Sequence, residues 1–275
     1  GVKALPWERW IGQRDAFPVK GWSLDSKLHS VPDCQSIIKK AIVERLKSHY
    51  HIGWFEETGA TFQVQFTLRR DEATLLIDTS GAGLHKRGYR QNAGGAPIKE
   101  TLAAAMVDLT RARNAAHVYD PCCGSGTLPI EAALAAKRIA PGIRRRFTFM
   151  DWDCVPDEVW RAERTRAMEM EQRDRAFSAW GGDIDPECVA LTRDNAAKAK
   201  VGDCLQAAVA DLKQFRPQGG SGVVLCNPPY GERLLDVRQA EQLYREMGRV
   251  FRPQAGWSYA IISPHEHFEQ LFGRK

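Results

Sequence analysis

Hydrophobic residues recur every three to four positions over residues 30–50, where Ile38, Ile42 and other apolar side chains share one side of a helix. Apolar and polar residues then alternate over 61–68 and 73–78, which indicates two strands joined as a hairpin. A helix packed on a hairpin is a small α+β module. The front of the chain is therefore predicted to be such a module.

From about residue 96 the pattern changes to short apolar segments that alternate with helical ones, which is typical of an α/β domain with a parallel sheet. Strands are predicted at 117–119, 179–183, 207–210, 223–226 and 257–263. Residues 141–176 interrupt this alternation and are predicted to be an insertion with a charged helix. Its three consecutive arginines, Arg144 to Arg146, either contact phosphate or are ordinary surface charge.

A glycine-rich turn, Asp120-Pro-Cys-Cys-Gly-Ser-Gly126, follows the first of these strands and opens an alanine-rich helix. A carboxylate at a strand end followed by glycines forms a cradle for a nucleotide-like ligand, since glycine lets the backbone approach closely. A dinucleotide fingerprint would need a glycine where Pro129 stands, and a phosphate-binding P-loop would need a lysine where Thr127 stands. The ligand predicted for this turn is therefore S-adenosylmethionine.

Acidic residues follow the next two predicted strands as well. Asp183 ends the second strand, and its two oxygens are expected to hold ribose hydroxyls. Asp185 is expected to cap the helix that follows. Asp211 and Leu212 come after the third strand and are expected to lie beside an adenine ring.

A second motif, Asn227-Pro-Pro-Tyr230, ends the strand at 223–226. The prolines have no N–H, so their carbonyl groups and the Asn227 amide oxygen form a set of acceptors at the carboxyl end of a strand. Such acceptors suit the two hydrogens of an exocyclic amine, with Tyr230 stacked on the base that carries it. The alternative is a strand-end turn that merely uses prolines.

Composition excludes little: hydrophobic residues make up 43% and charged residues 27%, as in ordinary globular proteins. No apolar run approaches the length of a membrane span and no leader is evident, so a cytoplasmic location is expected. The seven cysteines include no C-x-x-C pair, so we expect reduced thiols and no metal site.

The net charge of +5 is concentrated at the front, where residues 1–92 hold 14 Lys and Arg against 10 Asp and Glu. This surplus suits a polyanion partner or is a solvated face. Within it, the stretch 80–92 has several cations around Tyr89 and glycines that break regular structure. It is expected either to contact phosphates with one stacking ring or to be a solvated connection between domains.

The stretches FPVKGWS, SVPDCQSIIKKAI, LLIDTSGAGLHKRGYR, APIKETLAAAM, DPCCGSGTLPIEAAL and NPPYGERL together resemble the bacterial THUMP-containing methyltransferases of 23S ribosomal RNA, a group often labelled N6-adenine-specific DNA methylases. The resemblance implies an α/β fold: a Rossmann-like class I methyltransferase domain preceded by a partial α+β THUMP domain. The implied ranges are 1–80 for the THUMP domain, 81–95 for a linker and 96–275 for the methyltransferase domain. The opening THUMP segment and the last strands of the sheet are expected to lie outside this sequence.

The family resemblance implies methylation of guanine N2 in large-subunit ribosomal RNA, with S-adenosylmethionine as cofactor, RNA as partner, and no metal or membrane. The expected catalytic residues are Asn227, Pro228, Pro229 and Tyr230. The expected cofactor-binding residues are Lys99, Thr101, Asp120, Pro121, Gly124, Ser125, Gly126, Thr127, Asp183, Ile184, Asp211, Leu212 and Asn227. The expected RNA-binding residues are Lys20, Lys27, Lys39, Lys40, Lys86, Arg87 and Arg90.

Two other functions are compatible with these motifs. Methylation of adenine N6 in RNA or DNA uses the same grip on an amine, although the front module favours RNA. A ribosome-assembly factor that binds RNA without catalysis is the alternative from a different class. The intact Asp120, Gly124, Gly126 and Asn-Pro-Pro-Tyr argue against it.

Overall fold

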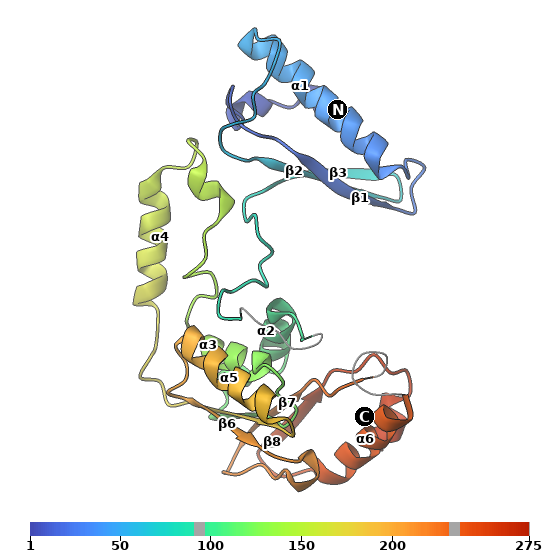
Figure 1. Cartoon of the computed structure of the whole chain (residues 1–275), viewed down its shortest axis with the longest axis vertical. Coiled ribbons are helices and arrows are strands. Elements are labelled where there is room, and N and C mark those ends of the chain that lie inside the picture. The colour runs from blue at the N-terminus through green and yellow to red at the C-terminus, as the bar shows by residue number, and fades with distance from the viewer. Residues whose placement is uncertain (91–96, 231–236, 275) are drawn as a thin grey trace. The chain divides into compact units, whose positions relative to one another are not determined.

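The computed structural model describes residues 1–90, 97–230 and 237–274. The chain forms two compact units (Figure 1). Unit 1 consists of Gly1–Gly83 and Arg146–Arg164, and unit 2 consists of Leu84–Arg145 and Thr165–Lys275. No helix in the described ranges combines the length and the apolar character that a membrane crossing would need.

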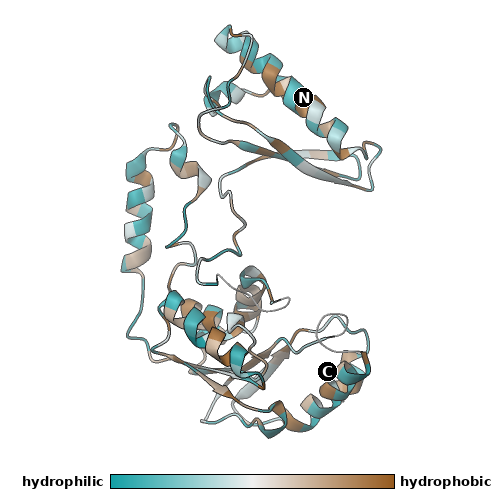
Figure 2. Cartoon of the chain, viewed as in Figure 1, coloured by the Kyte–Doolittle hydropathy of each residue, from teal (hydrophilic) through white to brown (hydrophobic). Residues whose placement is uncertain are grey.

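Unit 1 contains a three-stranded sheet in the order β1-β2-β3 and a long helix, α1. Their bounds are β1 Val19–Leu24, α1 Val31–Tyr50, β2 Gln63–Arg69 and β3 Glu72–Asp78. Strand β1 runs parallel to β2, and β2 is antiparallel to β3. The amphipathic helix and the hairpin predicted from the sequence are confirmed. The α1 ribbon carries both hydrophilic and hydrophobic residues (Figure 2).

Strand β1 is the strand of unit 1 that the sequence pattern did not predict. Gly21, which lies in its middle, is opposite Phe66 of β2, and a Cβ at Gly21 would come within 2.4 Å of the Phe66 ring. A side chain could not fit there, so the glycine allows the ring to cover the strand. The glycine that weakens the sequence signal is thus required by the packing.

Residues 146–164 cluster with unit 1 and not with the other residues that follow Gly83. Trp152 is 6% exposed and its Nε1 donates to the Thr61 carbonyl at 3.0 Å. The backbone N–H of Phe149 donates to the Thr79 carbonyl at 3.1 Å. The compact units therefore do not follow the predicted ranges 1–80 and 96–275 at this segment, and the unit boundary at Arg164 falls within helix α4, Asp157–Glu169.

Unit 2 is built on a five-stranded, fully parallel sheet in the order β6-β5-β4-β7-β8. The strands are β4 His117–Asp120, β5 Ser178–Asp183, β6 Leu205–Val209, β7 Gly222–Cys226 and β8 Trp257–Ile261. The helices are α2 Glu100–Leu109, α3 Thr127–Ala136, α5 Pro186–Ala199, α6 Val237–Val250 and α7 Phe268–Phe272. This is the Rossmann-like arrangement expected from the alternating pattern, in which the strand order reverses between β4 and β7.

All five residues of β7 are buried, and alternate side chains face two different layers. Val223 and Leu225 belong to the core shared with α2, α3 and α5. Val224 and Cys226 belong to the core shared with α6 and α7. Because both faces of the sheet are covered by helices, ligand access is left to the edge where the strands end.

Candidate functional site

The predicted glycine turn connects β4 to α3 in a backbone form that favours glycine. Gly124 and Gly126 have φ of +52° and +79°. A Cβ at Gly126 would lie 2.7 Å from Cγ2 of Thr192. A side chain at Gly126 would therefore be strained by its backbone conformation and would also collide with α5.

Two carboxylates fix this turn between β4 and β5. The Asp120 carboxyl accepts a hydrogen bond from the Cys122 backbone N–H at 3.1 Å. The Asp183 carboxyl accepts from Gly124 N at 2.9 Å and from Asp185 N at 3.0 Å. Asp185 in turn accepts from Glu187 N at 2.8 Å and caps α5, as the sequence predicted.

A cavity of about 500 Å³ opens at the carboxyl ends of β4, β5, β6 and β7, within the size range of small-molecule sites. It lies where the order of the strands reverses, which is the usual ligand position in an open α/β sheet. Residues from both predicted motifs line it together. Those expected from the sequence are Asp120, Pro121, Gly124, Ser125, Thr127, Asp183, Ile184, Asp211, Leu212, Asn227, Pro228, Pro229 and Tyr230.

Three residues expected at the cofactor do not line this cavity: Lys99, Thr101 and Gly126. Lys99 is exposed and precedes α2 as its N-cap, and Thr101 is exposed on the first turn of that helix. Gly126 forms part of the turn between β4 and α3 and does not line the cavity. Conversely, the cavity is also lined by residues that were not among the expected cofactor-binding or catalytic ones, namely Pro97, Ile98, Cys122, Cys123, Leu128, Asp185, Cys188, Leu191, Ala210 and Leu243.

Asp120 is the most deeply buried carboxylate of the cavity wall, with 1% of the residue exposed. Burial, opposed by the hydrogen bond from Cys122 N and assisted by the nearby Asp183, raises the pKa of Asp120 to about 8. A positively charged ligand in the cavity would favour the ionised form of this carboxyl. The site is thus suited to a cation.

The cavity fits S-adenosylmethionine by its chemistry. Asp120 and Asp183 offer negative charge to a ligand that carries a sulfonium and an ammonium group, and a carboxylate is an acceptor for ribose hydroxyls. Ile184, 73% exposed next to Asp183, offers apolar surface to a flat ring. The described residues contain no group of His, Cys, Asp and Glu able to hold a metal ion.

Asn227 and Tyr230 lie at the end of β7 and belong to the wall of the same cavity. Asn227 is half-buried and Pro228 is buried, whereas Tyr230 is 40% exposed. The two ends of the Asn-Pro-Pro-Tyr motif are therefore presented differently, with an amide in the wall and a ring toward solvent. Gly231 and Glu232, which follow the motif, lie outside the described residues.

The predicted RNA-binding cations fall into two groups. Lys20, Lys27, Lys40 and Lys86 are exposed, so their RNA contacts stay a prediction. Lys39 forms an ion pair with Glu57 and lies 3.4 Å from the centroid of the Phe17 ring. Among the three consecutive arginines, Arg146 pairs with Asp151 and Arg144 donates to the Lys198 carbonyl.

Arg87 and Arg90, expected either to contact RNA phosphates or to lie on a solvated connection, are instead nearly buried in unit 2. Their side chains are 10% and 11% exposed and pair with Glu131 and Glu100, whose side chains are 3% exposed. Tyr89, expected as a stacking ring, is 4% exposed and donates to Glu131 at 3.0 Å. These side chains are interior groups of unit 2, because buried charges require partners.

The fold and this cavity define a methyltransferase of the S-adenosylmethionine-dependent class. Residues 87–275 match the RMKL-like methyltransferase domain family and residues 1–78 match the THUMP domain. The chain belongs to the RMKL-like methyltransferase family and carries a THUMP domain in front of the catalytic one.

Similar proteins match the chain over nearly all of its length. “Putative RNA methyltransferase YpsC” of Bacillus subtilis is 46% identical over 276 residues, which cover 100% of this chain and 72% of that protein. Ribosomal RNA large subunit methyltransferase K/L of Psychromonas ingrahamii is 34% identical over 96% of this chain and 36% of its own length. The crystal structure of SMU.472 complexed with SAH superposes with a TM-score of 0.90 at 40% identity, covering 100% of this chain and 73% of that one.

Proposed function

We propose that this protein transfers a methyl group from S-adenosylmethionine to the N2 amine of a guanine in large-subunit ribosomal RNA. The observation that supports this most is that Asn227 to Tyr230 line the same cavity as Asp120 and Asp183. A base held by the first group of residues would thus meet a cofactor held by the second. The THUMP domain and the names of the relatives favour RNA as the carrier of that base.

The bound cofactor supplies an electrophilic methyl group, and the protein's part is to hold the amine in line with it. The Asn227 amide oxygen and the Pro228 carbonyl each accept one hydrogen of the exocyclic amine, which directs the nitrogen lone pair toward the methyl carbon. Tyr230, which is partly exposed, stacks on the base taken out of its helix. Such alignment removes much of the barrier without a covalent intermediate.

The choice of guanine rests on the family resemblance, and RNA as substrate rests also on the relative named as an enzyme of the large ribosomal subunit. An amine on adenine presents the same two hydrogens, so the hydrogen bonds to Asn227 and Pro228 do not by themselves distinguish adenine from guanine. The RNA module in front of the catalytic unit favours RNA over DNA.

The experiment that tests the proposal is methylation of unmodified 23S RNA with isotopically labelled S-adenosylmethionine, followed by digestion and mass spectrometry of the nucleosides. Label in N2-methylguanosine is expected. Label in N6-methyladenosine would overturn the choice of base, but it would still agree with Asn227 and Pro228 binding an exocyclic amine. RNA binding without label in any nucleoside would identify a non-catalytic binding factor, provided that the cofactor itself binds.

A further inference from the structure

The segment 84–90 brings two guanidinium groups into the interior of unit 2, next to but not inside the cofactor cavity. Each one has a nearly buried carboxylate as partner: Arg87 Nε lies 3.6 Å from Glu131 Oε1, and Arg90 Nη2 lies 2.9 Å from Glu100 Oε2. Removing charge from water is costly, and a partner offsets that cost. The two arginines are alike in burial and in having an acidic partner. Their roles must therefore be distinguished by their other hydrogen bonds.

Arg90 is connected to the wall of the cofactor cavity. Its Nη1 donates to the Ile98 carbonyl at 2.9 Å and to Thr127 Oγ1 at 3.2 Å. Thr127 Oγ1 lies 3.2 Å from Ser125 Oγ, and both hydroxyl residues line the cavity. A chain of polar contacts therefore leads from Glu100 through Arg90 and Thr127 to Ser125.

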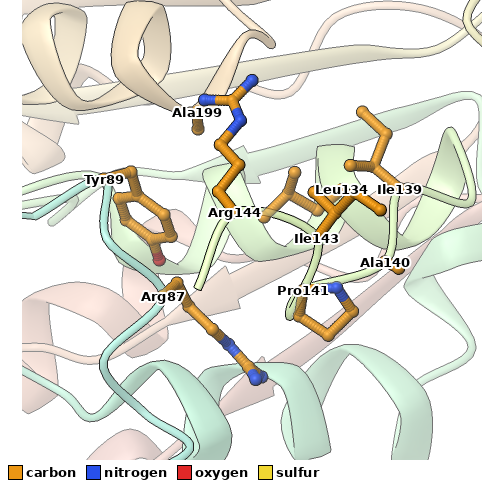
Figure 3. A pocket seen from close by; sticks show the side chains of 9 residues that line it. All are labelled: Arg87, Tyr89, Leu134, Ile139, Ala140, Pro141, Ile143, Arg144 and Ala199. Atoms are coloured by element: carbon orange, nitrogen blue, oxygen red, sulfur yellow. The ribbon is translucent and has the colours of Figure 1, made fainter. Parts of the chain in front are cut away.

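Among the described residues, no hydrogen bond or ion pair joins Arg87 to the wall of the cofactor cavity. Its Nη1 donates to the Leu84 carbonyl at 2.9 Å, and its carboxylate partner, Glu131, does not line the cofactor cavity. Figure 3 shows Arg87 and Tyr89 among the residues that line a separate cavity of about 30 Å³, together with Ile139, Ala140, Pro141, Ile143 and Arg144. That volume is about the space of one water molecule.

Chemistry sets the direction of one hydrogen bond in the Arg90 chain, the one between Arg90 and Thr127. A guanidinium has donors only, so Thr127 Oγ1 must accept from Arg90. Either hydroxyl of the Thr127–Ser125 pair can be the donor, and when Thr127 donates to Ser125 Oγ, the Ser125 proton is available to a ligand. Ser125 is kept in place by Asn195, which is fully buried and whose Nδ2 donates to the Ser125 carbonyl at 2.9 Å.

We propose that Arg90 is a positioning residue of the cofactor site, which orients the Thr127 and Ser125 hydroxyls so that Ser125 donates to an acceptor group of the ligand. The acceptor proposed here is the carboxylate in the amino-acid part of S-adenosylmethionine, which is its only negatively charged group. The proposal rests on the cavity being the cofactor site and is independent of which base is methylated. It also assigns a role to a residue of the segment that precedes the catalytic core.

The test is calorimetry with two ligands, SAH, which has the amino-acid carboxylate, and methylthioadenosine, which lacks it. Arg90→Met should weaken SAH binding at least tenfold and change methylthioadenosine binding less than twofold. Arg90→Lys should recover part of the SAH affinity, because an ammonium can still donate to Thr127 Oγ1. The matched control is Arg87→Met, which should lower the melting temperature to a similar extent while both ligands bind within twofold of the wild type.

Thr127→Val provides a second variant of nearly unchanged shape and should show the same selective loss of SAH affinity, even if Arg90→Met does not fold. The proposal is overturned if the Arg90 and Thr127 variants weaken both ligands equally, or if they bind both like the wild type. Failure of the wild type to bind either ligand would instead overturn the assignment of the cavity to the cofactor. The nucleoside analysis of the methylated RNA would separately report on the proposed reaction.

Discussion

Trp152 stacks on Phe62 with their ring centroids 4.3 Å apart and 18° between the ring planes. The two residues are 90 positions apart in the sequence, and Trp152 comes from the insertion between α3 and β5. An aromatic pair of this kind in a buried site contributes beyond its buried area. The insertion therefore completes the core of unit 1 and is not a surface extension of the catalytic domain.

Replacing Trp152 by Ala should destabilise unit 1 by about 3–5 kcal/mol, because a large buried side chain is lost and a cavity is left. Trp54→Ala is the matched control, since Trp54 is 81% exposed, and it should change stability by less than about 0.5 kcal/mol. Urea unfolding followed by circular dichroism measures both. SAH affinity, a property of unit 2, should stay unchanged in both variants, and equal stability of the two variants would contradict the packing role.

Asn227→Ala should abolish methyl transfer while leaving cofactor affinity almost unchanged. The alanine removes an acceptor for the amine but not the Asp120 and Asp183 side of the cavity. Labelled methyl transfer to RNA and calorimetry with SAH measure the two effects separately. Tyr230→Phe is a suitable control because it keeps the ring, and it should retain most of the activity. Transfer by Asn227→Ala above a few per cent of the wild-type rate would exclude the amine-holding role.

The affinity for S-adenosylmethionine should rise with pH until about pH 8, the raised pKa of Asp120. Below that value the buried carboxyl is protonated and must lose a proton before it can pair with the cationic ligand, so affinity should fall by up to about tenfold per pH unit. Calorimetry between pH 6 and 9 measures this slope. Asp120→Asn should bind more weakly at pH 9 and should lack the slope. An unchanged slope in that variant would assign the titration to another group.

The stability of unit 2 should fall as the pH rises from about 4.5 to about 7, in part because of Glu131. Burial raises the pKa of Glu131 to about 7, against the lowering effects of Arg87 and Tyr89. The folded state then holds a proton that the unfolded state has already released, so stability decreases with pH in this window and is constant above it. A shift of this size corresponds to about 3 kcal/mol.

Glu131→Gln tests this expectation, because glutamine keeps an acceptor for Tyr89 but cannot ionise. Its unfolding free energy should depend less on pH between 4.5 and 7 than that of the wild type. Asp120 contributes a change of the same sign that extends to about pH 8, so Asp120→Asn combined with Glu131→Gln should give the flatter profile. Identical pH profiles for the wild type and the single variant would rule out Glu131 as a source.

The amino-acid sequence determined the two motifs of the site and the alternating fold of unit 2, because both depend on local rules. A glycine turn after Asp120 and a proline pair after Asn227 restrict the backbone wherever they occur, and apolar runs between helices predict a parallel sheet. Strand order then brings the two motifs together, because parallel strands end at the same edge.

The tertiary structure alone decided which cations are buried and which unit each segment joins. In the sequence Arg87 and Arg90 look like solvent-exposed cations. The neighbouring residues do not indicate that Glu131 and Glu100 are their partners in the fold. In the same way, Trp152 packs with Phe62 through a contact between distant parts of the chain. Local patterns report backbone preferences and burial of one face, whereas partners across the fold are set by long-range packing.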